Sequence, residues 1–225
     1  PFWAESKARG DALFYGFPVD AAFRIGQRYL QYTQMCVVDY MIRDLAAVDL
    51  DAPANVETQH VREIPREVDA LYARVRQDKK CLMRRDHRYL DWRYVQNPAR
   101  ADYEVWTARR GGQLVGLMVL KPDSGLAPDA ATIADWLVPE GDVDAQRALL
   151  AAAVRRQREK NRQRLMTVVP DWSYERRMLE QAGFVHTPSA NWMQRRLVHN
   201  INHPPITAEF LAANWWFQLG DSDLA

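Results

Sequence analysis

The stretch YEVWTARRGGQLVGLMVL, residues 103–120, carries the clearest structural signal in this sequence. Two runs rich in aromatic, β-branched and other apolar residues, 103–108 and 114–120, flank the polar turn 109–113. Within that turn, Gly111 and Gly112 allow the positive φ angles that a tight chain reversal needs. The stretch therefore predicts two adjacent antiparallel strands.

Working outward from this hairpin, the sequence predicts an alternating order of strands and helices. Before the hairpin we expect a strand at 56–64, a helix opened by Pro65, and a short helix at 86–94 that ends before Pro98. After the hairpin we expect a strand at 131–138, the longest helix at 142–161 and a buried strand at 164–169. A helix at 172–182 closed by Gly183 and a last strand pair ending near Leu197 complete the order. This order is β-α-α-β-β-β-α-β-α-β-β, which indicates a mixed α/β protein.

The first fifty residues repeat the end of this order. At a single offset, the 152 residues between Pro18 and Pro170, the segment DYMIRDL at 39–45 mirrors NWMQRRL at 191–197. The preserved sequence of strand, proline, helix, aromatic residue and strand favours an internal duplication. We therefore expect residues 1–50 to be the C-terminal portion of a first copy, 51–198 a complete second copy, and 199–225 a tail that docks on the core.

The repeat has a consequence for the start of the chain. At the same offset, residue 1 corresponds to Ala153, in the middle of the long helix of the second copy. A strand and helix without the rest of their sheet would leave apolar faces in water. We therefore expect the missing N-terminal half to be supplied by a larger protein or by another chain.

Composition excludes several classes of protein. With 48% hydrophobic and 26% charged residues among 225, the chain has the profile of a soluble globular protein and not of a disordered one. A formal net charge of +1 argues against nucleic acid or an anionic membrane as partner. Cys36 and Cys81 form no metal or disulfide pattern, and no apolar run is long enough to span a bilayer, so we expect a cytoplasmic location.

Three segments resemble a known superfamily. They are DHRYLDWRY at 86–94 with Pro98, FYGFP at 14–18, and the tail WWFQLGDSD at 215–223. Together with the element order, they resemble the GNAT (Gcn5-related N-acetyltransferase) fold, and the duplication resembles bacterial tandem-GNAT proteins. The resemblance implies a mostly antiparallel central sheet flanked by helices, with part of a second GNAT-like copy at the N-terminus.

The resemblance also implies an activity, an acyl-CoA-dependent N-acyltransferase that moves an acetyl or other acyl group to a small-molecule or protein amine. In GNAT proteins the pantetheine arm pairs with the fourth strand and the diphosphate binds backbone N–H groups at the start of the following helix. Carried over by position, these contacts fall on Leu137, Val138, Pro139, Glu140, Gly141, Asp142 and Val143. The acceptor pocket would be lined by Trp92, Arg93 and Tyr94, although a short helix with aromatic anchors would show the same pattern.

The sequence departs from the GNAT pattern in two places. The expected glycine-rich loop has one glycine, and Glu140, Asp142 and Asp144 favour an ordinary capped helix and would repel a diphosphate. Where many GNAT proteins carry a tyrosine general acid, this chain has Leu179 in the second copy, so we assign no catalytic residue. The second copy is therefore expected to be degenerate; the alternative is that the chain is a non-catalytic binding or structural module.

No metal site is expected either. His199 and His203 would suit a metal only on a helix, and the prolines at 204 and 205 disfavour one. The arginine-rich stretch 155–164 lies toward the end of the long helix, where the helix dipole favours cations, and we expect it to face solvent.

Overall fold

The computed structural model describes residues 2–192, 194–202 and 205–222. The chain divides into two units. Unit 1 comprises residues 1–40 and 187–215, and unit 2 comprises residues 41–186 and 216–225. Each unit therefore takes segments from both ends of the chain.

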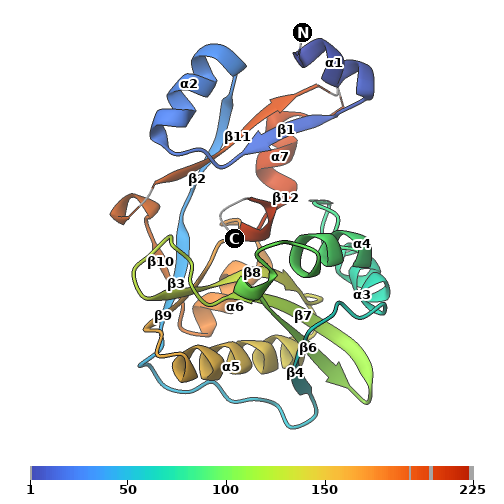
Figure 1. Cartoon of the computed structure of the whole chain (residues 1–225), viewed down its shortest axis with the longest axis vertical. Coiled ribbons are helices and arrows are strands. Elements are labelled where there is room, and N and C mark those ends of the chain that lie inside the picture. Colours follow the sequence, from blue (N-terminus) through green and yellow to red (C-terminus); the bar gives the residue numbers. More distant parts are fainter. Residues whose placement is uncertain (1, 193, 203–204, 223–225) are drawn as a thin grey trace. The chain divides into compact units, whose positions relative to one another are not determined.

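Unit 2 is built on a seven-stranded sheet in the order β10-β3-β9-β8-β7-β6-β4 (Figure 1). Its strands are β3 (Tyr40–Asp44), β4 (Glu57–Val61), β6 (Glu104–Arg110), β7 (Gln113–Lys121), β8 (Ala130–Leu137), β9 (Arg164–Thr167) and β10 (Val185–Thr187). β8 and β9 run parallel, whereas β3 with β9, β4 with β6, β6 with β7 and β7 with β8 are antiparallel. The expected mixed α/β fold with a mostly antiparallel central sheet is confirmed.

The remaining elements of unit 2 are short except for one helix. They are α3 (Val68–Val75), β5 (Cys81–Leu82), α4 (His87–Leu90), a π-helical turn (Asp91–Val95), a 3₁₀ turn (Arg100–Asp102), α5 (Val143–Glu159), α6 (Tyr174–Gln181) and a second 3₁₀ turn (Leu219–Asp221). α5 packs against β4, β6, β7 and β9. Gly116 on β7 permits this close approach, because a Cβ there would lie 2.9 Å from Leu149 Cδ1. The core of unit 2 lies between this helix and the sheet.

Unit 1 contains a three-stranded sheet in the order β1-β11-β2. Its strands are β1 (Leu13–Gly16), β2 (Thr33–Val38) and β11 (Arg195–Ile201), accompanied by α1 (Phe2–Arg9), α2 (Asp20–Leu30), a 3₁₀ turn (Ser189–Asn191) and α7 (Ala208–Asn214). The two-residue strand β12 (Trp215–Trp216) follows α7. α7 packs on β2 and α2 packs on β11 within this unit.

The units do not begin and end at the segment boundaries expected from the sequence. β3 follows β2 along the chain but joins the sheet of unit 2 beside β9, and β11 follows β10 but joins unit 1 beside β1. The order β10-β3-β9 in one sheet thus matches β2-β11-β1 in the other. The duplication itself stays a prediction.

The register of these strands departs from the single sequence offset. Met41 lies opposite Thr167, so the offset of 152 would place Met193 opposite Tyr15. His199 takes that position instead, six residues further along, and Met193 itself lies outside the described residues. An ungapped sequence match does not reveal such a shift, because residues 188–192 and 194, between β10 and β11, form no strand.

Candidate functional site

Strands β8 and β9 separate partway along their length. Their parallel pairing covers only Ala130–Thr132 against Arg164–Met166. At the point of separation, Thr167 Oγ1 donates a hydrogen bond to the carbonyl oxygen of Ile133 at 3.0 Å. Beyond it, residues 133–137 of β8 keep β7 on one side and lose β9 on the other. We call residues 133–137 the free edge of β8.

The chain's own C-terminal segment, Trp216–Ser222, binds this free edge. The backbone N–H of Trp136 donates to Gln218 Oε1 at 2.6 Å, and Gln218 Nε2 donates to Asp135 Oδ1 at 3.2 Å. A backbone donor on a strand edge needs a partner when it is buried. The carboxamide of Gln218 therefore supplies the acceptor that a neighbouring strand would otherwise supply to the N–H of Trp136.

A buried charge cluster lies beside these bonds. Arg85 is 1% exposed and donates to Asp135 at 2.7 Å and to Asp221 of the C-terminal segment at 2.5 Å. The hydroxyl of Tyr94 donates to the other oxygen of Asp135. Gln218 N donates to Asp221 Oδ2 at 2.8 Å, so the segment also bonds within itself.

Burial and neighbouring charges shift the pKa values of Arg85, Asp221 and Tyr94 in this cluster. Burial lowers the pKa of Arg85, but the charges of Asp135 and Asp221 outweigh it and hold the pKa well above its ordinary value. Burial raises the pKa of Asp221, although Arg85 opposes the shift. Burial and the neighbouring charge of Asp135 raise the pKa of Tyr94 well above its ordinary value, so this hydroxyl stays protonated and remains a donor.

A second cluster connects the C-terminal segment to helix α6. The ammonium of Lys79, whose side chain is 1% exposed, pairs with Glu175 at 2.8 Å and with Glu140. Trp216 Nε1 donates to Glu175 Oε2 at 2.9 Å, and Lys79 Nζ lies 5.1 Å from the centroid of the Trp216 ring. The C-terminal segment is thus held from β8 on one side and from α6 on the other.

The seven residues expected to bind the cofactor run from the last residue of β8, through the loop, to the first residue of α5. Leu137 and Val138 are buried, Pro139, Glu140 and Asp142 are half-buried, and Gly141 and Val143 are exposed.

Protein groups bind several of the polar atoms of this loop. The N–H of Glu140 donates to the carboxylate of Asp78 at 3.1 Å. Asp142 caps α5 by accepting from Ala145 N at 3.1 Å, and Arg110 binds both of its oxygens at 2.6 and 3.1 Å. Gln146 Nε2 donates to the carbonyl oxygen of Glu140 at 3.0 Å. A carboxylate therefore stands at one of the N–H groups that the resemblance assigns to a diphosphate, that of Glu140.

The three residues expected to line an acceptor pocket have different surroundings. Trp92 is 59% exposed and borders a pocket of about 570 Å³ with Arg84 and Tyr89. Arg93 donates to the carbonyl oxygen of Ser222 in the C-terminal segment. Tyr94 is buried against Asp135. Arg93 and Tyr94 serve the docking of the C-terminal segment, and Trp92 alone faces solvent.

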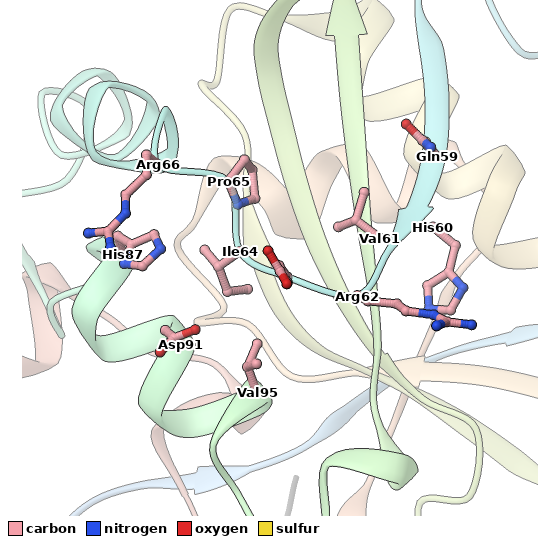
Figure 2. Close-up of a pocket in the computed structure, with 11 residues that line it drawn as sticks. Gln59, His60, Val61, Arg62, Ile64, Pro65, Arg66, His87, Asp91 and Val95 are labelled. Carbon is pink, nitrogen blue, oxygen red and sulfur yellow. The ribbon is translucent and has the colours of Figure 1, made fainter.

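A larger pocket of about 830 Å³ lies at the end of β4 (Figure 2). In Figure 2, Arg66 reaches toward His87, while His60 and Arg62 extend to the other side of the pocket. Its lining carries charges of both signs, and none of the residues expected from the sequence belongs to it. Its residues come from two segments, 59–66 and 87–95, whose proximity no sequence pattern indicates.

The surroundings of Leu179, Tyr174 and Cys81 disfavour a catalytic role for each of them. Leu179, at the position of the expected tyrosine, is 3% exposed and packs in the apolar core. The nearby Tyr174 hydroxyl donates to Gln146 Oε1 at 3.2 Å. Burial, followed by the charge of Asp221, raises the pKa of the Cys81 thiol, which makes it a weaker nucleophile at neutral pH.

The described residues hold no group of three or more His, Cys, Asp and Glu side chains that could bind a metal ion, and His203 lies outside them. Within the same part of the chain, every helix is too short or too polar to cross a membrane.

Several residues of these clusters were not expected from the sequence. Asp78, Lys79, Arg85 and Asp135 lie on loops or strands without a motif that marks them. Asp221 belongs to the tail motif at 215–223, so that motif was the one available signal. The last residue of the motif, Asp223, lies outside the described residues.

No protein-family model matches this sequence, and no curated protein matches it. Solved structures do match. A GCN5-related N-acetyltransferase from Anabaena variabilis ATCC 29413 aligns with a TM-score of 0.64 and 11% identity, over 90% of this chain and 49% of that chain. A conserved protein of unknown function from Enterococcus faecalis V583, described as "Probable N-Acyltransferase", aligns with a TM-score of 0.61 and 12% identity, over 89% and 48%.

A third match is a tandem GNAT protein from the clavulanic acid biosynthesis pathway, with a TM-score of 0.54 and 14% identity, over 90% of this chain and 69% of that chain. The chain thus spans about half the length of the first two matching structures. At these identities the likeness concerns the fold.

Proposed function

We propose, from the GNAT fold that this chain has in common with those structures, that it belongs to an acyl-CoA-dependent N-acyltransferase and that unit 2 does not itself carry the reaction. Fold alone does not fix function, so the proposal depends on the chemistry of the site. Its main support is the carboxylate of Asp78 at the N–H of Glu140.

Electrostatics favours this interpretation over a working cofactor loop. Asp78 already accepts from the N–H of Glu140, and Asp142 accepts from the N–H of Ala145 in the first turn of α5. Two like charges about 4 Å apart near a protein surface repel by roughly 4 kcal/mol. The helix dipole favours an anion by only about 0.3–1 kcal/mol at an exposed site. The repulsion is the larger effect, so a diphosphate would have to displace Asp78 and break the ion pairs of the loop.

The chemistry of the leaving group gives further support. Acyl transfer from a thioester needs a proton for the departing thiolate, and a positioned side chain can supply it. Leu179 cannot donate one, and Tyr174 is engaged with Gln146. Neither position gives unit 2 a proton donor aimed at the free edge of β8.

The remaining parts of the proposal concern the whole protein. An N-terminal GNAT half, in the same protein or another chain, would bind acetyl-CoA or another acyl-CoA and transfer the acyl group to a small-molecule or protein amine. Unit 2 would then contribute packing or ligand binding. Cys36 and Cys81 are both reduced cysteines, which suits a reducing compartment, and we propose a cytoplasmic location.

Calorimetry tests the proposal. Acetyl-CoA is titrated into the folded 225-residue chain, with dephospho-CoA as comparison. We expect no saturable heat for either compound. Micromolar binding of acetyl-CoA that is weakened by Gly141→Pro would contradict the proposal, because it would show that the loop accepts a diphosphate.

A further inference from the structure

The carboxamide of Gln218 binds β8 through both of its ends. Its oxygen accepts from the N–H of Trp136, and its nitrogen donates to Asp135. An amide group is both donor and acceptor, and this pairing uses both functions on consecutive residues of one strand edge. The carboxamide oxygen therefore occupies the backbone N–H that the amide carbonyl of an extended arm would use on the same edge.

The rest of the C-terminal segment fits the space beside β8 closely. Trp216 and Leu219 are each 1% exposed. At Gly220, an added Cβ would lie 2.4 Å from Asp135 Oδ2 and 2.6 Å from the Tyr94 hydroxyl, so only glycine fits there. The Tyr89 hydroxyl donates to the carbonyl oxygen of Gly220 at 3.2 Å. This close fit indicates a specific occupant.

We propose that the segment Trp216–Ser222 is an internal ligand of the free edge of β8, occupying the place where an acyl-CoA arm would bind. This inference deepens the proposed function and rests on it, because it identifies what closes the site of unit 2. An external arm reaches β8 only in the fraction of molecules whose C-terminal segment is released, and its apparent affinity falls by that fraction.

The buried charges keep the released fraction small. Asp221 leaves with the segment, and Arg85 then has one carboxylate partner in place of two. Lys79 loses the Trp216 ring that lies over its ammonium, and Glu175 loses the indole donor. Buried groups that lose their partners are costly, so the occupied state dominates.

The test compares two glycine substitutions in the full chain. Gly220→Ala inserts a methyl group against Asp135 and Tyr94, whereas Gly141→Ala meets no atom within 4 Å and serves as the matched control. We expect Gly220→Ala to speed hydrogen exchange of the Trp136 amide about tenfold or more, with the amides of β6 and β7 unchanged. Pantetheine, which has the arm but no diphosphate, should then shift the Trp136 amide resonance in Gly220→Ala only.

A second variant keeps the test decisive if Gly220→Ala does not fold. Gln218→Leu removes the carboxamide at similar volume, and the Trp136 amide should again exchange faster than in Gly141→Ala. Unchanged exchange at Trp136 in both variants overturns the inference, as does a released segment with no pantetheine response. Binding of acetyl-CoA to the wild-type chain would instead overturn the proposed function, so the two failures are distinguishable.

Discussion

At the scale of single residues, Arg85 holds the most consequential position in unit 2. It lies between Asp135 on β8 and Asp221 on the C-terminal segment, and all three side chains are no more than 2% exposed. Buried charges are tolerated only when they are paired and hydrogen-bonded. The guanidinium of Arg85 thus compensates the buried charges of both Asp135 and Asp221.

Arg85→Met should therefore destabilise the chain strongly. The substitution keeps much of the apolar bulk but leaves two buried carboxylates without a cation, a loss of roughly 3–5 kcal/mol. Its neighbour Arg84 pairs with Asp86 but its side chain is 75% exposed, so Arg84→Met should cost less than about 1 kcal/mol. Urea unfolding of both variants measures the difference, and equal losses would argue against the buried cluster.

Glu104 provides a pH-dependent prediction at the same scale. Burial would raise its pKa, but hydrogen bonds from Arg156 and Lys160 lower it to about 2, against an ordinary value of 4.5. Because the folded-state pKa is depressed, the stabilisation is complete above about pH 4.5 and is lost as the pH falls toward 2.

Glu104→Gln should lower the free energy of unfolding by roughly 1–2 kcal/mol at pH 7. When urea unfolding is repeated at lower pH, the gap between wild type and variant should shrink and should close only below about pH 2. A gap that stays constant as the pH falls from 7 to 2 would show that it does not arise from the ion pairs of Glu104.

At the scale of elements, the start of α5 is stabilised by the same acidic residues that argue against diphosphate binding. Asp142 accepts from the N–H of Ala145 and binds Arg110. A side-chain cap satisfies a backbone donor that the helix leaves open. The protein itself therefore supplies a capping group at the start of α5.

Asp142→Ala should lower the free energy of unfolding by about 1 kcal/mol. Asp51, whose side chain is 95% exposed, gives the control substitution Asp51→Ala, which should change stability by less than about 0.5 kcal/mol. Thermal unfolding of both variants measures the effect. Equal stability of the two variants would show that the cap formed by Asp142 does not stabilise the protein.

Local chemistry explains which elements could be predicted. The hairpin strands β6 and β7 meet at Gly111 and Gly112, whose φ angles are 53° and 79°, as paired glycines indicate. α5 runs from Val143 to Glu159 within the predicted range 142–161. The predicted helix at 86–94 splits into α4 and a π-helical turn, because the turn Asp91–Val95 follows tertiary contacts of Arg93 and Tyr94 that apolar periodicity does not encode.

At the scale of the whole molecule, the sequence indicated the fold and the acidic loop before α5, but not which groups lie along the free edge of β8. The acidic loop and Leu179 are local signals, and they could be recognised from their positions. Bonds between Trp136 and Gln218, or between Arg85 and Asp221, join residues far apart in the chain. A tail that docks on the core was expected, yet its docking site follows only from the three-dimensional arrangement.

The segment's largest side chain gives a prediction at this scale. Trp216 is 1% exposed, packs in the core of unit 2 and donates to Glu175. Trp216→Ala should lower the free energy of unfolding by about 3–5 kcal/mol, because it leaves a cavity and an unpaired carboxylate oxygen. Trp92→Ala, at a site 59% exposed, is the control and should cost less than about 1 kcal/mol in the same urea series.

The central claim is that unit 2 already occupies its own cofactor site, and hydrogen exchange at two backbone amides tests it most directly. The amides of Trp136 and Glu140 donate to Gln218 and Asp78. We predict that both are protected in the wild-type chain and that saturating acetyl-CoA leaves their exchange rates unchanged. Fast exchange without ligand, followed by protection when acetyl-CoA is added, would contradict the account.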